Sequence, residues 1–141
     1  MNSLLTTEEE ARLMDAIREV EAHTSAEIRI CITHKRIWWQ ERYAWKLFDL
    51  AGMRKTRNRN ATLIVMMPRV KKIVVIGDTG LNAVLAQGYW QETIEAMIHS
   101  MQSDGPLSAL LTGLQRIGDT LAEHWPRELD NPNELEDELM H

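Results

Sequence analysis

The chain has 141 residues, of which 44% are hydrophobic and 26% charged, close to the average for a globular domain. These values exclude a disordered, collagen-like or multidomain protein. No apolar run approaches the roughly 20 residues that cross a bilayer, and the first residues do not resemble a signal peptide. We therefore expect a cytoplasmic protein without direct membrane insertion. The single cysteine, Cys31, excludes an intramolecular disulfide and a thiolate cluster.

The charges are unevenly distributed along the chain. Six of the 21 acids lie in residues 127–141, which leaves fifteen acids and fifteen bases in the first 126 residues. We predict a single domain over residues 1–126, followed by an acidic C-terminal tail over 127–141. Between Arg54 and Lys72 there are seven bases and no acid, and this segment could meet either an anion or the chain's own tail.

The first half of the chain predicts two helices separated by a strand. Thr7 and Glu10 have the spacing of a capping box, and apolar residues at helical intervals then predict a helix over 8–22. Isoleucine at every second position of 28–32 is typical of a strand with one apolar face. A second amphipathic helix is expected over about 38–51, and the glycine that follows it would end it in a left-handed conformation.

The second half predicts a hairpin and two further helices. Apolar runs over 63–67 and 73–76, separated by a Pro-containing turn, indicate two strands covered on both faces. A third helix is expected from about residue 81 to 101, with Gly88 as a break in it. A fourth helix begins near Pro106, because proline suits the first helical position.

This order of elements predicts an α/β fold of the α/β/α sandwich type. The small mixed central sheet would hold two parallel strands plus an antiparallel hairpin strand, flanked by about four helices. Three loops, 23–26, 53–60 and 77–81, then share one end of the sheet, which we take as the leading site. The opposite end holds His34, Lys35, Arg36, Arg69 and Lys71. Ligands of open parallel sheets usually bind at the carboxyl ends of the strands, and this rule favours the opposite end. The rule is weak here because only two strands are parallel.

Asp78 is the leading candidate for a metal ligand. It follows a buried strand in a Gly-Asp-Thr-Gly turn, and hard cations such as calcium bind several oxygen ligands at once. Glu27 and Thr24, from a loop at the same end, could complete the set. The alternatives are that Asp78 makes an Asx turn or caps a helix, that Glu27 pairs with Arg29 or a basic loop residue, and that Thr24 serves only its loop.

Arg57 and Arg59 belong to a basic segment that could bind a phosphate, since arginine contacts two oxygens in fixed geometry, or that is simply solvated. A nucleic-acid partner fits less well, because the chain has no net positive charge and no reader motif. Trp38 and Trp39 are adjacent and cannot both face one side of a helix. One of them could therefore contact a protein partner or pack under the tail.

No catalytic residue can be assigned from local motifs. Four residues separate Cys31 from Arg36, whereas the phosphate loop of a cysteine phosphatase needs five, and Cys31 lies within a predicted strand. The five histidines have no metal-type spacing.

Several segments together resemble the TPM domain family, which includes thylakoid acid phosphatase-like and photosystem repair-like members, and in particular its short soluble bacterial branch. The match spans nearly the whole chain. It rests on His23-Thr24-Ser25-Ala26-Glu27-Ile28-Arg29, on residues 44–53 with Leu-Phe-x-x-x-Gly-Met, on Lys55–Ala61, on Ile76-Gly77-Asp78-Thr79-Gly80-Leu81-Asn82, on Tyr89-Trp90 and on the closing Asn133–Glu138.

The resemblance implies an α/β/α sandwich and a divalent-cation site, with calcium as the first candidate and magnesium as the second. It makes the chain a cation-binding accessory or interaction module, and the alternative is a metal-assisted acid phosphatase acting on phosphate monoesters. Ala26 and Ala61 stand where the family usually has glycine, and a methyl group at either position could narrow the crevice.

Overall fold

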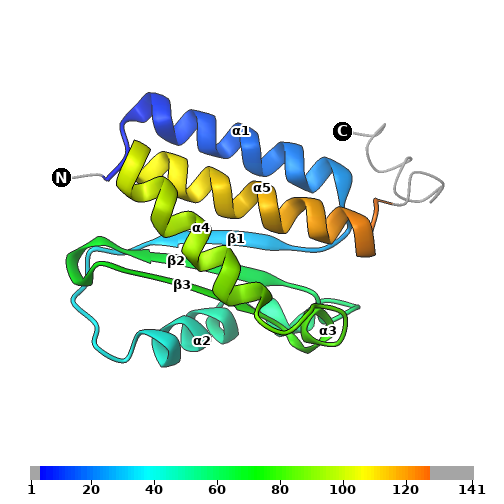
Figure 1. Ribbon diagram of the computed structural model, residues 1–141. Helices are drawn as coiled ribbons and strands as arrows, with labels where there is room; N and C mark the ends of the chain where they lie inside the picture. Colours follow the sequence, from blue (N-terminus) through cyan, green and yellow to red (C-terminus); the bar gives the residue numbers. More distant parts are fainter. Residues whose placement is uncertain (1–3, 128–141) are drawn as a thin grey trace.

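A computed structural model describes residues 4–127 of the chain (Figure 1). The predicted acidic tail, apart from Arg127, and the Asn133–Glu138 segment lie outside the described residues. The helices and strands are α1 (Thr7–His23), β1 (Ile28–Ile32), α2 (Gln40–Leu50), β2 (Thr62–Met67), β3 (Lys72–Gly77), α3 (Thr79–Asn82), α4 (Tyr89–Asp104) and α5 (Pro106–His124), with 3-10 turns η1 at Met53–Lys55 and η2 at Pro68–Val70.

The boundaries of three elements differ from the prediction. The capping box of α1 joins Thr6 to Glu9, one residue earlier than expected, with the Thr6 hydroxyl accepting from the Glu9 N–H at 3.1 Å. The expected third helix is two helices, α3 and α4, separated by residues 83–88, and Gly88 adopts a left-handed φ of 85° just before α4. Helix α2 starts at Gln40 rather than at 38, and the left-handed Gly52 follows it as predicted, with φ 69°.

The sheet has the predicted mixed topology, in the order β1-β2-β3. β1 pairs with β2 in parallel, with Ile28 opposite Thr62, and β2 pairs with β3 antiparallel, with Thr62 opposite Gly77. The beginning of β1, the beginning of β2 and the end of β3 therefore share one end of the sheet. This register confirms that the three loops of the predicted site gather there.

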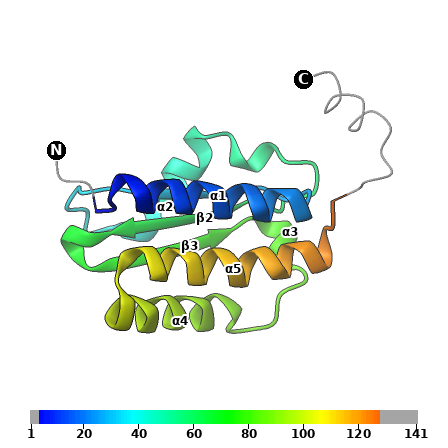
Figure 2. The ribbon, with the colours of Figure 1, turned by 90° about the horizontal axis from the view of Figure 1, so that it is seen from above.

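Helices cover both faces of the sheet, which confirms the α/β/α sandwich. α1, α5 and α4 lie side by side on one face, with α5 in the middle, and α2 covers the other face (Figures 1 and 2). Side chains along β2 point alternately to the two faces of the sheet and so contribute to a hydrophobic cluster on each. Ile64 and Met66 pack in the cluster under α1, α4 and α5. Leu63, Val65 and Met67 pack in the cluster under α2. None of the described helices is long and apolar enough to cross a bilayer.

Candidate functional site

Asp78 follows strand β3 and is the N-cap of the short helix α3. Its N–H donates to the Ala61 carbonyl at 3.0 Å, which extends the β2–β3 ladder by one step. Its carboxylate oxygen Oδ1 accepts from the Thr79 N–H at 2.7 Å and thereby caps α3. The capping role considered for Asp78 is therefore real, and the strand and the cap together fix where the carboxylate points.

Both carboxylate oxygens of Asp78 are bound by one guanidinium group. Arg59 donates from Nε to Oδ2 at 2.7 Å and from Nη2 to Oδ1 at 2.9 Å. The Arg54 guanidinium lies farther off, with Nη1 3.9 Å from Oδ1. Asp78 is 1% exposed and is the only charged residue that is buried within 4–127, whereas the Arg59 side chain is 43% exposed. Arg59 thus covers a buried anion from the solvent side.

The loop that carries the two arginines is held from several directions. Arg54 lies over the rings of Trp45 and Phe48 in α2, at 4.9 and 5.6 Å from their centroids, and pairs with Asp49. At the other end of the loop, the Arg59 carbonyl accepts from the Gly80 N–H at 2.8 Å. These contacts hold the two arginines beside Asp78 independently of the ion pair with its carboxylate.

A side chain at position 80 would collide with the loop. A Cβ atom there would meet the carbonyl oxygen of Asn58 and would lie 2.6 Å from that of Arg59. Glycine is therefore required by the close approach of the two backbones, which brings loop 53–60 against the turn that follows β3.

The environment of Asp78 acts on its pKa in two opposite ways. Burial raises the pKa of the carboxyl, but the hydrogen bonds from Arg59 and Thr79 and the charges of Arg59 and Arg54 outweigh burial and hold the pKa below its usual value. The same hydrogen bond to Asp78 raises the pKa of Arg59. At neutral pH the pair is therefore a carboxylate and a guanidinium.

Glu27 lies in the same row of the sheet as Asp78. The Thr62 N–H donates to the Glu27 carbonyl at 2.9 Å, and the Asp78 N–H donates to the Ala61 carbonyl. The three adjacent strand ends therefore form one row, in the order Glu27, Ala61, Asp78. Two strand spacings separate the Glu27 and Asp78 backbones by about 10 Å. The Glu27 carboxylate pairs with Arg29, whose Nε lies 3.3 Å away, as the alternative interpretation anticipated.

The methyl group of Ala61 stands between the two carboxylate-bearing residues. Ala61 is buried in the cluster under α2, together with Leu63 and Ile76, so its side chain is on the face to which strand alternation also assigns Glu27 and Asp78. Ala26, by contrast, packs in the cluster on the other face of the sheet. Of the two alanines that replace family glycines, only Ala61 borders the row.

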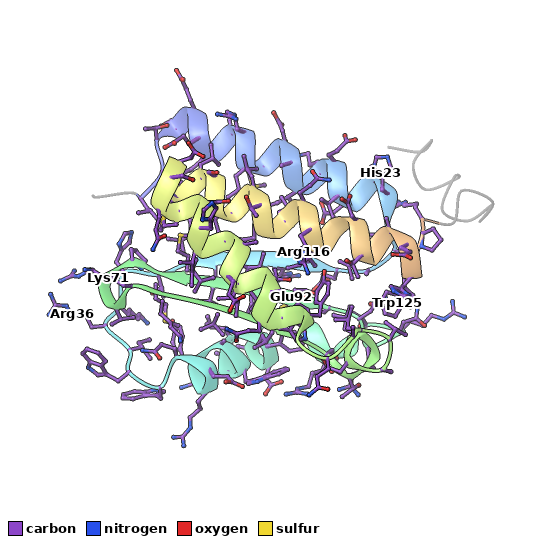
Figure 3. All side chains as sticks on the ribbon, viewed as in Figure 1. His23, Arg36, Lys71, Glu92, Arg116 and Trp125 are labelled. Atoms are coloured by element: carbon purple, nitrogen blue, oxygen red, sulfur yellow. The ribbon has the colours of Figure 1, made fainter. Side chains whose placement is uncertain are left out.

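The structure does not bring Thr24 to Asp78. Its hydroxyl lies 2.6 Å from the Trp125 carbonyl oxygen and 3.1 Å from that of Leu121, and it accepts from the Ala26 N–H at 3.1 Å. Thr24 also forms a β-bridge with Pro126. It therefore connects the segment before β1 to the C-terminal end of α5, where Figure 3 shows His23 and Trp125 at the same end of the molecule.

Arg57 remains exposed in the loop and, unlike Arg59, makes no ion pair among the described residues. Two buried polar atoms nearby, Nδ2 of Asn60 and Oγ1 of Thr62, have no hydrogen-bond partner among residues 4–127. The amide nitrogen is a donor and cannot bind a cation. Thr62 alternates with Leu63 and therefore points to the opposite face from the row.

In this arrangement the side chains do not assemble a complete ligand set for a metal ion. Within residues 4–127, no group of three His, Cys, Asp or Glu side chains could hold an ion. Asp78 offers the buried carboxylate that a hard cation prefers, but Arg59 holds both of its oxygens. A cation would fit here only after Arg59 has moved away.

A groove lies away from Asp78, between α1 and α5. It has a volume of about 1110 Å³ and is lined by side chains that include Arg12, Glu19, Leu111 and Arg116. None of the residues predicted from the sequence for cation or phosphate binding lines it.

Comparisons with known proteins agree on one family. The family model of the TPM domain matches residues 1–120. The structure is similar to that of the BA42 protein from the psychrophilic bacterium Bizionia argentinensis, with 30% sequence identity and a TM-score of 0.84 over 93% of this chain and 90% of that one. No curated protein matches.

Two more distant structures share the fold. The N-terminal domain of a protein from P. gingivalis has 19% identity and a TM-score of 0.74, over 87% of this chain and 80% of that one. The N-terminal domain of the cg2496 protein from Corynebacterium glutamicum has 12% identity and a TM-score of 0.62, over 83% and 74%.

Proposed function

Since the chain belongs to the TPM domain family, we propose that it is a binding or accessory module that takes up a divalent cation at Asp78. Calcium is the first candidate and magnesium the second. The observation that carries the proposal is the buried Asp78 carboxylate, whose counter-charge is an exposed arginine side chain on a surface loop. We place this role in the cytoplasm, which cell fractionation would test, and the module would act on a protein partner.

Arg59 takes the place of the cation in this proposal. A buried carboxylate needs a positive partner, and either a guanidinium or a metal ion can supply it. A cation that displaced Arg59 would keep Asp78 paired and would release the guanidinium into water. Glu27, on the same face of the sheet, and oxygen atoms of loop 53–60 are the groups that would complete the site.

The alternative, a metal-assisted phosphatase, requires Arg57 and Arg59 to hold phosphate oxygens. Arg59 instead donates two hydrogen bonds to Asp78. Both functions therefore require Arg59 to leave Asp78, and the phosphatase activity becomes worth testing only if a cation releases Arg59.

A comparison of two charge-neutralising variants tests the exchange. Arg59→Gln removes both the charge and the competing guanidinium, whereas Lys55→Gln removes one charge from the same loop without touching Asp78. Calcium affinity of the metal-stripped proteins would be measured by isothermal titration calorimetry. We expect Arg59→Gln to bind calcium at least roughly tenfold more tightly than Lys55→Gln, because only Arg59→Gln removes the group that competes for the Asp78 oxygens. Each variant removes one positive charge, so the change in net charge is the same in both.

Equal affinities in the two variants would overturn the exchange between Arg59 and the cation. Calcium binding that is weaker in Arg59→Gln than in the wild type would also overturn it. Circular dichroism of both variants, recorded first, shows that each sample is folded.

A further inference from the structure

The most exposed apolar side chains of the described residues gather on and beside α2. Trp38 and Leu50 are each 74% exposed and Trp39 is 59% exposed, and no other large hydrophobic residue within 4–127 reaches these values. Single exposed apolar residues are common, but two adjacent indoles just before a helix, together with a leucine at its end, indicate an interaction surface.

Two of these exposed apolar residues, Trp39 and Leu50, share one side of α2 with basic side chains. Trp39, Arg42, Lys46 and Leu50 follow one another at intervals of three or four residues, so they line one side of α2. The buried residues of the helix lie on the opposite side, against the sheet. Trp38 lies just before α2, outside this helical spacing, and is also exposed. We call Trp38, Trp39, Arg42, Lys46 and Leu50 the α2 face.

The segment that presents the tryptophans is anchored to the rest of the protein. Ile37 is buried just before Trp38, and the side-chain amide of Gln40 donates to the Ile37 carbonyl at 2.7 Å. The Lys35 ammonium lies 6.0 Å from the centre of the Tyr43 ring. The indoles therefore project from a fixed support.

The α2 face continues into a basic end of the sheet. The Thr33 N–H donates to the Met66 carbonyl at 3.0 Å, which places the segment after β1 beside the β2–β3 turn. Figure 3 shows Arg36 and Lys71 at this end. Together, residues 33–50 and 68–72 contain seven bases and two acids, of which Asp49 pairs with Arg54. The acids of the first turn of α1 belong to the helical layer on the other side of the sheet.

We propose that the α2 face docks this protein on an anionic lipid surface, with α2 lying in the plane of the membrane. Indole rings favour the boundary between lipid headgroups and acyl chains, and Leu50 would bury its side chain there. Arg42 and Lys46 would contact lipid phosphates between them, and the basic end adds long-range attraction. This binding is peripheral and is independent of the cation site at Asp78.

The arrangement of the α2 face favours lipid over a macromolecular partner. Its apolar side chains lie at the two ends of α2 with Arg42 and Lys46 between them, on a convex helix, whereas the central hot spots of protein interfaces insert into packed pockets. A fluid anionic surface requires no such shape complementarity.

Vesicle co-sedimentation of the full chain tests the proposal. The probes are vesicles of phosphatidylcholine alone and of phosphatidylcholine mixed with phosphatidylglycerol. We expect binding only to the mixed vesicles, weaker binding at high salt, and loss of most binding in the double variant Trp38→Ser/Trp39→Ser. Arg42→Gln/Lys46→Gln should bind roughly 30-fold more weakly than the wild type, at about a factor of five per charge. The matched control Arg12→Gln/Arg18→Gln changes the net charge equally on the other layer and should bind within about threefold of the wild type.

Three outcomes would overturn the lipid assignment. The first is no binding of the folded protein to the mixed vesicles, and the second is equal weakening by the α2-face and α1 charge variants. The third is binding to a single-stranded oligonucleotide, measured by fluorescence anisotropy, that depends on Trp38 and Trp39 while vesicle binding does not. Because all these substituted side chains are exposed, a loss of binding with an unchanged circular dichroism spectrum reports on the surface.

Discussion

The Arg59 guanidinium binds both carboxylate oxygens of Asp78, at 2.7 and 2.9 Å, and the two residues differ sharply in exposure. Removing either partner breaks the same pair but leaves a different charge behind. Loss of Asp78 frees an arginine that water already reaches, whereas loss of Arg59 leaves a buried carboxylate. The pair is therefore asymmetric in its contribution to stability.

We expect Arg59→Ala to lower the free energy of unfolding by about 2–3 kcal/mol, with Arg54 compensating for part of the lost charge. Asp78→Asn should cost only about 1 kcal/mol, because the amide oxygen can still cap α3. Urea unfolding at neutral pH measures both values. A cost for Asp78→Asn that equals or exceeds that of Arg59→Ala would contradict the asymmetry.

Acid should weaken the wild type more than Asp78→Asn. The pKa of Asp78 is lower in the folded protein than its unfolded value of about 3.9, so the stabilisation is complete above that value and is lost as the pH falls through the folded pKa. The free energy of unfolding, measured by urea denaturation at pH 6 and pH 3, should fall further in the wild type. An equal fall in both proteins would show that Asp78 does not contribute to acid sensitivity.

Gly80→Ala should separate loop 53–60 from the turn after β3. The added methyl group would collide with backbone carbonyls, which cannot move as a side chain can, and the Gly80 N–H would lose the Arg59 carbonyl. We predict a loss of about 2 kcal/mol in stability and amide shifts over residues 56–60 in two-dimensional NMR. A fully stable variant with unshifted loop amides would mean that the two backbones are not in close contact.

Ala61→Gly should trade stability for cation affinity. The Ala61 methyl is buried under α2, so its removal should cost about 1–1.5 kcal/mol. It also stands between Glu27 and Asp78, and its removal should therefore tighten calcium binding in calorimetry. Ala26→Gly is the matched control, because Ala26 packs on the other face. Unchanged calcium affinity in Ala61→Gly would exclude the methyl group as an obstacle.

The fold, and the end of the sheet at which loops 23–26, 53–60 and 77–81 gather, could be predicted from local patterns. Alternating isoleucines in β1 and the two apolar runs of the hairpin fixed the strands and their directions, and the directions placed three loops together. The position of the capping box could not be decided, because Thr6 and Thr7 each precede a glutamate by three residues.

The contacts of the site residues could not be predicted, because they join distant parts of the chain. Arg59 and Asp78 are 19 positions apart, and the Thr24 hydroxyl meets carbonyl groups 97 and 101 positions away. Only packing decides which of several arginines reaches a buried carboxylate. The ion pair from Glu27 to Arg29 was among the alternatives that the sequence left open, because the two residues are only two positions apart.

A two-dimensional NMR titration of the metal-stripped protein with calcium, and then with magnesium, tests the central claim most directly, with Asp78→Asn titrated alongside. The account predicts saturable shifts at Glu27 and over residues 53–60 and 77–81, a shift of the Arg59 side-chain Nε–H signal as the guanidinium is released, and none of these changes in Asp78→Asn. Identical titrations of the two proteins, or no shifts at millimolar concentrations of either ion, would contradict it.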